Sequence, residues 1–356
     1  MRLLPTKKEE YSFEEIIDEM IWEAWKTVTH YHLRLGVTVN GNPENFLEHA
    51  VRTLYECCKD DLQNKISSRE RIKSLIRKYK DALLPDKMHL TDYVPYRLIK
   101  PFVDKEGKHL IDSDNYKRFI AYYSSFTKTN NEFFYDIIDG VNPLQRRIRL
   151  NREWAEFMNT HYALIMGWIQ YKKADYLQDR NPGVPGVMKK ISPEADEKRK
   201  SLEEARKLWI MTVELTGQPL REIYTGKDLE ISAFDLDHFV PWSFVANDEL
   251  WNLTPINKSL NSSKGNRLPE KRFIGEFINY HRYLYELMFD NDDESQARAL
   301  LDQLDKCKTH NINANWAIQK LYRQGVSKTE FGNVLQENLE LIYESARMQE
   351  YELWIQ

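Results

Sequence analysis

Residues 234–244 read FDLDHFVPWSF, and residues 250–266 read LWNLTPINKSLNSSKGN. Apolar residues alternate loosely with polar ones in the first stretch, and the second opens with β-prone residues, so each predicts a short strand. Asp237 and His238 stand together at the end of the first predicted strand, and Asn261 follows the second. The sequence therefore predicts a small strand-containing unit that carries an acid, an imidazole and an amide.

These residue types suit the hydrolysis of a phosphodiester bond. The attacking water must lose a proton, and a histidine can accept it because its unperturbed pKa lies close to working pH. The phosphoryl and leaving oxygens need positive charge nearby. A carboxylate and an amide carbonyl are hard oxygen ligands that suit Mg²⁺, which keeps waters and binds phosphate oxygen.

The whole pattern resembles the HNH, or His-Me finger, nucleases: D-H-x-x-P-x-S, then N-L, then N-x-x-K-G, over about residues 220–272. The resemblance implies two antiparallel strands and a helix around one divalent ion. It implies that His238 is the general base and that Asp237 and Asn261 hold the metal. Asn252 matches the asparagine that braces the histidine-bearing loop, and Asn261 makes this an H-N-N variant. The family's products are a 5′-phosphate and a 3′-hydroxyl.

One departure from the family concerns zinc. Many relatives carry cysteine pairs around the finger, the first in a phrase like C-I-Y-C-G-K, whereas residues 222–227 here read EIYTGK and Leu260 stands where a cysteine often precedes the last metal ligand. The three cysteines of the chain, Cys57, Cys58 and Cys307, form no spaced zinc framework. We expect no structural zinc, and we expect neighbouring helices to hold the finger.

Helical spacing dominates the rest of the chain. A capping box at Ser12–Glu15 predicts a helix that ends near Gly36, and Asn42–Pro43 predicts the start of a second. The proline- and tyrosine-bearing stretch 84–101 predicts a break. Further helices are predicted over 114–138 and 150–178.

The C-terminal half also contains signals for a linker and for the start and end of a helix. Residues 181–186, NPGVPG, predict a linker, and Ser192–Pro193 predicts the start of a helix that stops at Gly217. Helical spacing resumes beyond Glu270. We predict a predominantly α-helical α+β protein with four parts: a helical region over 1–185, a linker and long helix over 186–217, an HNH domain over 218–285 and a helical region over 286–356.

Charge gives limited guidance. The formal net charge of −4 and the pI near 6.2 argue against a protein that coats nucleic acid non-specifically. Five basic residues cluster after the second predicted strand: Lys258, Lys264, Arg267, Lys271 and Arg272. They fit a phosphate-holding surface and equally fit solvated helix charge. The arginine-rich run 142–152 could grip backbone phosphates, and we interpret it as a charged helix start. The chain has no G-x-x-x-x-G-K-[ST] loop for ATP.

The sequence thus predicts a soluble, cytoplasmic endonuclease that needs Mg²⁺ or Mn²⁺ and cleaves nucleic acid, DNA by default because the mechanism uses water instead of a sugar hydroxyl. No apolar run is long enough for a membrane span. One alternative is a non-cleaving nucleic-acid-binding or regulatory subunit that keeps the HNH fold as a scaffold. Another is an effector of a bacterial defence system that a partner ATPase or sensor protein activates.

Overall fold

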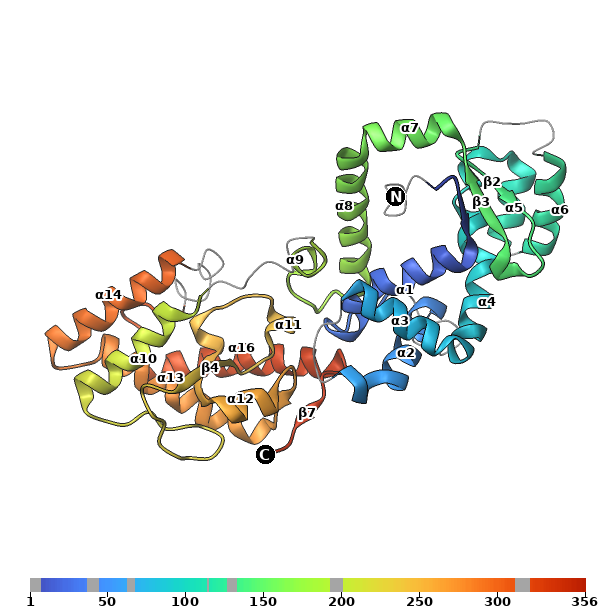
Figure 1. Ribbon diagram of the computed structural model, residues 1–356. Helices are drawn as coiled ribbons and strands as arrows, with labels where there is room; N and C mark the ends of the chain where they lie inside the picture. The colour runs from blue at the N-terminus through green and yellow to red at the C-terminus, as the bar shows by residue number, and fades with distance from the viewer. Residues whose placement is uncertain are drawn as a thin grey trace. The chain divides into compact units, whose positions relative to one another are not determined.

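The computed structural model describes residues 8–36, 45–62, 68–113, 115–126, 133–192, 201–310 and 321–356. These residues divide into two compact units, Met1–Asn181 and Pro182–Gln356. Helices dominate both units and small sheets accompany them, so the predicted α+β class is confirmed (Figure 1). The division falls in the NPGVPG segment.

The first unit is built on a cluster of four helices. They are α1 (Phe13–Thr29), α2 (Phe46–Leu62), α3 (Arg69–Lys78) and α4 (Lys80–Arg97). The predicted capping box opens α1, because Ser12 Oγ accepts the Glu15 N–H and the Glu15 carboxylate accepts the Ser12 N–H. The apolar faces of these helices share one buried core that includes Ile21, Trp25 and Leu54.

Two predicted helix boundaries in this unit are wrong. Helix α1 ends at Thr29 instead of Gly36, where the chain folds back so that the Leu33 N–H bonds the Thr27 carbonyl. Helix α4 runs through Pro85 and Pro95 without a break, because each proline forfeits a single helical hydrogen bond and the buried face of α4 offsets that cost. The predicted start at Asn42–Pro43 lies outside the described residues.

A three-stranded sheet interrupts the helices of the first unit. Strands β1 (Glu10–Ser12), β3 (Arg147–Leu150) and β2 (Tyr135–Ile138) pair antiparallel in the order β1-β3-β2. Of the helix predicted over 114–138, residues 116–126 are helical, but residues 135–138 form β2 instead. In the run 142–152, which was predicted to be a charged helix start, residues 147–150 form β3, and a helix begins only at Arg152. In β3, RIRL alternates exposed arginines with half-buried Ile148 and Leu150, a two-residue period that fits a strand.

The remaining described elements of the first unit are two 3₁₀ turns and four helices. They are the 3₁₀ turns η2 (Lys100–Phe102) and η3 (Pro143–Gln145) and the helices α5 (Lys105–Asp112), α6 (Tyr116–Phe126), α7 (Arg152–Thr160) and α8 (Tyr162–Arg180). The predicted helix over 150–178 is thus two helices that meet at His161. Phe119, Tyr123 and Phe133 join a second buried cluster beside the sheet.

The second unit surrounds a β-hairpin with helices. Its elements are α9 (Val187–Ile191), α10 (Glu203–Thr216), β4 (Phe234–His238), α11 (Trp242–Val245), η5 (Leu250–Asn252), β5 (Leu253–Asn257), α12 (Lys258–Lys264), β6 (Leu268–Pro269), η6 (Lys271–Phe273), α13 (Ile274–Phe289), α14 (Glu294–His310), α16 (Lys328–Met348) and β7 (Leu353–Trp354). Gly217 ends α10 in the left-handed conformation at φ 68°, as predicted. The predicted start at Ser192–Pro193 runs into residues outside the described ranges.

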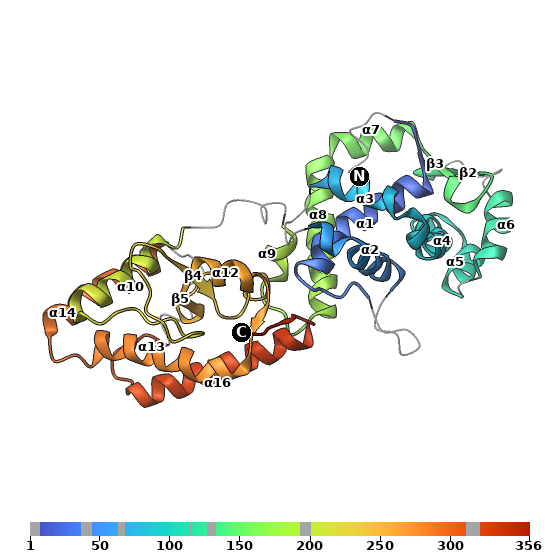
Figure 2. The same cartoon turned by 60° about the horizontal axis from the view of Figure 1, so that its bottom comes forward.

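Two helix pairs enclose the hairpin region. Helices α10 and α14 lie side by side, as do α13 and α16, in both views (Figures 1 and 2). The ring of Phe277 on α13 packs against Phe239, which follows β4, with centroids 4.5 Å apart. The short parallel pair β6–β7 brings the C-terminal segment back beside α12, where Trp354 Nε1 donates to Ser263 Oγ at 3.2 Å. The hairpin therefore packs on an apolar face of α13.

Within the described part of the chain, no helix combines the length and the apolar character that crossing a bilayer requires.

Candidate active site

The β4–β5 hairpin and α12 position the predicted site residues. The strands pair antiparallel with Asp237 opposite Thr254 and His238 opposite Leu253. Asn257 caps α12 by accepting the Ser259 N–H at 2.9 Å, so the helix starts directly where β5 ends. This two-strand, one-helix unit is the arrangement that the resemblance implies.

Asp237 sits in a buried, charge-paired environment. Its side chain is 5% exposed. One carboxylate oxygen accepts from Lys264 Nζ at 2.9 Å and the other from Tyr224 Oη at 3.0 Å. Burial and the neighbouring carboxylate hold the pKa of Tyr224 well above its ordinary value, so the phenol stays a donor. Burial lowers the pKa of Lys264, and Asp237 opposes that shift.

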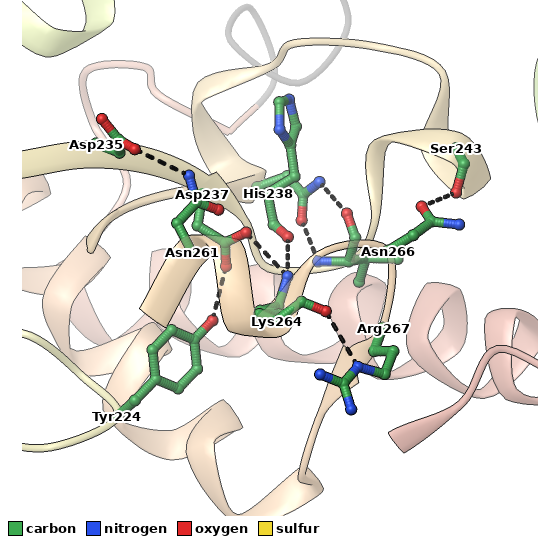
Figure 3. Close-up of polar contacts among 11 residues, drawn as sticks. Tyr224, Asp235, Asp237, His238, Ser243, Asn261, Lys264, Asn266 and Arg267 are labelled. Carbon is green, nitrogen blue, oxygen red and sulfur yellow. Dashed lines mark hydrogen bonds and ion pairs between the residues drawn. The ribbon is translucent and has the colours of Figure 1, made fainter. Parts of the chain in front are cut away.

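His238 points away from that cluster (Figure 3). Its Nε2 lies 3.0 Å from Asp248 Oδ1, and the two side chains are 9% and 10% exposed. Within the described ranges no hydrogen bond is made to Nδ1. The imidazole therefore has one nitrogen held by a carboxylate and one nitrogen available to a water molecule.

Asn252 fastens the loop that follows His238. Its Oδ1 accepts the Val240 N–H and its Nδ2 donates to the Val240 carbonyl, both at 2.8 Å. Its backbone carbonyl also accepts the Phe239 N–H at 2.8 Å. Asn252 is fully buried. This contact pattern fits the bracing role that the resemblance gives it.

Asn261 on α12 faces β4. Its Nδ2 donates to Asp235 Oδ2 at 3.4 Å, and Asp235 shares one strand face with Asp237 because they are two residues apart. Figure 3 shows these three side chains on the β4 face that α12 covers. The amide carbonyl of Asn261 and two carboxylates thus form a set of hard oxygen donors. Donors of this chemistry suit a small divalent cation. Both oxygens of Asp237 are bonded here to Lys264 and Tyr224, and the described residues contain no group of three or more His, Cys, Asp or Glu side chains that could hold a metal ion.

The predicted basic surface separates into different environments. Lys264 is 1% exposed and also donates to the His238 carbonyl at 2.7 Å, so its assignment to a surface that contacts nucleic acid is wrong. Lys271 pairs with Glu344 and Arg272 with Glu270. The inward position of Lys264 follows from helical geometry, since it lies three residues after Asn261 and on the same face.

A glutamate replaces the first cysteine of the zinc-binding relatives. Glu222 is 2% exposed, and its carboxylate accepts the Asn257 N–H at 2.8 Å, which ties the 222–227 loop to the end of β5. The Glu222 N–H bonds the Lys227 carbonyl, and Gly226 adopts a φ of 69° that closes the turn. This loop carries Tyr224, the donor to Asp237.

Sequence reasoning missed Asp235, Asp248 and Tyr224. Asp235 could have been found from its two-residue spacing to Asp237, which places both on one strand face. Asp248 and Tyr224 reach the site across loops whose course no local pattern predicts.

Comparisons with known proteins agree with this geometry. Residues 222–270 match the family model described as HNH endonuclease. These residues form an HNH domain. Over 135 residues the chain is 27% identical to the CRISPR-associated endonuclease Cas9 of Listeria innocua serovar 6a, a match that covers 33% of this chain. The chain spans about a tenth of the length of that relative. No solved structure matches it.

Both similarities support a nuclease-type function. The matched segment contains the β4–β5 hairpin and α12, and it therefore includes Asp237, His238, Asn252 and Asn261, whereas Lys271 and Arg272 of the predicted basic surface lie just beyond it.

Proposed function

We propose that this protein is a divalent-metal-dependent endonuclease that hydrolyses phosphodiester bonds in DNA. One observation carries the proposal: within an HNH domain, His238, whose Nδ1 makes no hydrogen bond with a described residue, directly follows Asp237 in a strand whose acids Asp235 and Asp237 face Asn261 and Lys264 of α12. An imidazole beside a hard-cation site is what water-driven phosphodiester cleavage needs.

The roles follow from what each side chain contacts. His238 Nδ1 takes the proton from the attacking water, and Asp248 at Nε2 stabilises the imidazolium that forms. Asn252 holds the loop that carries the ring in place through Val240. Tyr224 and Lys264 orient the Asp237 carboxylate.

Asp237 and Asn261 would hold the metal, with Asp235 beside them. Mg²⁺ or Mn²⁺ suits these donors, since both prefer oxygen ligands. Once bound, such an ion neutralises charge that develops on the phosphoryl and leaving oxygens. Proton transfer and the positioning of the reacting groups are the work of the side chains described in the preceding paragraph.

DNA is the favoured substrate because the proposed chemistry uses water and makes no use of a 2′-hydroxyl. Lys258 and Arg267, together with the paired Lys271 and Arg272, supply positive charge beside the hairpin for backbone phosphates. The similarity to a CRISPR-associated endonuclease is consistent with a role in a defence system. We further propose that this system is cytoplasmic and that a partner ATPase or sensor protein activates this chain.

A cleavage assay tests the function directly. Purified full-length protein is incubated with supercoiled plasmid, linear duplex, single-stranded DNA and RNA, with Mg²⁺, with Mn²⁺ or with a chelator. We expect metal-dependent cleavage of DNA that leaves 5′-phosphate ends. His238→Ala should reduce the rate by about 10²- to 10⁴-fold, because it removes the general base.

The matched control is His161→Ala, which removes an exposed histidine at the end of α7 in the other unit. We expect it to cleave like the wild type. Equal cleavage by wild type and His238→Ala, or cleavage that persists in chelator, would contradict the proposal.

A further inference from the structure

The contact between His238 and Asp248 ties together two residues that are ten positions apart. Nε2 and Oδ1 are 3.0 Å apart, and both side chains are about nine-tenths buried. An ionised carboxylate accepts hydrogen bonds and donates none, so a hydrogen bond between the two side chains places the proton on Nε2. The neutral imidazole then carries its lone pair on Nδ1.

We propose that Asp248 is a positioning residue that holds His238 in the Nε2–H form and thereby makes Nδ1 the nitrogen that receives the proton. The inference rests on the function proposed above and assigns a residue that the family pattern D-H, N, N does not contain. A carboxylate behind a general base fixes both its tautomer and its ring orientation. It also offsets the positive charge of the imidazolium.

The loop that carries Asp248 is anchored firmly enough for this role. After Asp248, Asn252 is bonded twice to Val240. Before it, Lys190 Nζ donates to the Phe244 carbonyl at 2.5 Å and Lys189 Nζ to the Ala246 carbonyl at 2.6 Å. These bonds fix the backbone on both sides of Asp248, so its carboxylate has a defined position relative to the ring.

The two acids next to His238, Asp237 in sequence and Asp248 in space, have different proposed roles. The Asp237 carboxylate is bound by an ammonium and a phenol on the β4 face that α12 covers. The Asp248 carboxylate is bound to the imidazole, which points away from that cluster (Figure 3). Loss of Asp237 should weaken metal binding, whereas loss of Asp248 should leave metal affinity unchanged and misplace the proton on His238.

The first test needs no variant. The nitrogen spectrum of histidine side chains in ¹⁵N-labelled, metal-free full-length protein distinguishes protonated from unprotonated ring nitrogens, and the His238→Ala spectrum identifies the His238 signals among the nine histidines. We expect a protonated-type signal at Nε2 and an unprotonated-type signal at Nδ1. The reverse tautomer, or an even mixture of the two, in the wild type overturns the inference.

The second test uses Asp248→Asn, which keeps the size of the side chain and removes its charge. An amide can accept from Nε2–H or donate to Nε2, so we expect both His238 tautomers to be populated. The cleavage rate constant kcat should fall about 10- to 100-fold, with KM and the calorimetric Mg²⁺ affinity unchanged. In the His238→Ala background the same substitution should cause no further loss.

Asp228→Asn is the matched control, since Asp228 is exposed in the same unit and lies near Arg221. It should change neither the His238 tautomer nor kcat. If His238→Ala abolishes cleavage while Asp248→Asn keeps full kcat and the single tautomer, the positioning role fails and the nuclease function stands. If His238→Ala cleaves normally, the function itself fails.

Discussion

The two sides of the β4–β5 hairpin each hold a buried histidine, and the two are bonded differently. His281 on α13 is fully buried, with Nε2 3.1 Å from the Leu253 carbonyl and Nδ1 2.6 Å from Tyr322 Oη. Burial lowers the pKa of His281 to about 3. His238 gives one nitrogen to a carboxylate, and its other nitrogen makes no hydrogen bond with a described residue.

This difference shows how the surroundings of a histidine decide its use. The Leu253 carbonyl can only accept, so Nε2 of His281 must donate and its Nδ1 must accept from the tyrosine. Both nitrogens are committed, and a proton cannot be added without breaking a bond in a buried site. His281 therefore joins α13 to β5, whereas His238 keeps a lone pair for chemistry.

The same contrast applies to buried charge. The side with α12 keeps an ion pair, Lys264 with Asp237, that is 1% and 5% exposed. The side with α13 keeps its polar groups neutral, and the pKa of Tyr322 is raised well above its ordinary value by burial. A buried ion pair adds little net stability by itself. Its presence here marks the side of the hairpin where a charge is needed.

The largest expected effect on stability comes from removal of one member of that ion pair. Lys264→Met leaves Asp237 buried beside a phenol alone, and we expect a loss of about 3 to 5 kcal/mol in the free energy of unfolding. Mg²⁺ should then raise the melting temperature of the variant by more than it raises that of the wild type, because the cation replaces the missing positive charge.

Lys258→Met on the same helix is the control, since Lys258 is exposed. Amide exchange along β4 and β5 would locate the effect within the hairpin. A Lys264→Met protein with wild-type stability in chelator would show that the site needs no cation, and it would remove the distinction between the two sides.

A smaller loss is expected on the other side. His281→Leu keeps the volume but leaves the Leu253 carbonyl and the Tyr322 hydroxyl without their partner, so we expect a loss of about 2 to 4 kcal/mol. Tyr322→Phe removes one of the two bonds and should cost about 1 kcal/mol. Chemical unfolding measures both.

Cleavage per folded molecule should be unchanged in His281→Leu. This reverses the pattern expected for His238→Ala, which loses cleavage and retains most of its stability. If His281→Leu abolished cleavage at full stability, the assignment of a structural role to His281 would be wrong.

Local patterns in the sequence predicted a large part of this arrangement. The strands around Phe234 and Leu253 and the helix stop at Gly217 depend on neighbouring residues, and the structure confirms them. The placement of the neighbours Asp237 and His238 at the end of a strand could likewise be predicted, because both residues lie in one motif.

Other features depended on contacts between distant segments. The arginine-rich strand β3 forms because β1, about 140 residues earlier, supplies Glu10 opposite Arg149. Charge composition alone favoured a helix start there. Asp248 reaches His238 because the bonds between Asn252 and Val240 close the intervening loop. Loop closure of this kind leaves no periodic signature in the sequence.

Another buried lysine of the same unit, Lys190, gives the smallest expected effect. Lys190 is 2% exposed, and its Nζ bonds a carbonyl, that of Phe244, in contrast to the carboxylate partner of Lys264. Burial lowers the pKa of Lys190 to about 7. Above pH 7 the folded protein therefore loses this proton, while the unfolded chain holds it until about pH 10.

Since the unfolded state binds more protons in that window, the contribution of Lys190 to stability must rise with pH. We expect the unfolding free energy of wild type, relative to Lys190→Met, to increase between pH 7 and pH 9 by on the order of 1 kcal/mol per pH unit. Lys189→Met, which alters the exposed neighbour on α9, should show no such slope. If the difference in unfolding free energy between wild type and Lys190→Met did not change with pH, the Lys190 ammonium would stay charged in the folded protein. A buried lysine could then remain charged without a carboxylate partner such as the one that Lys264 has.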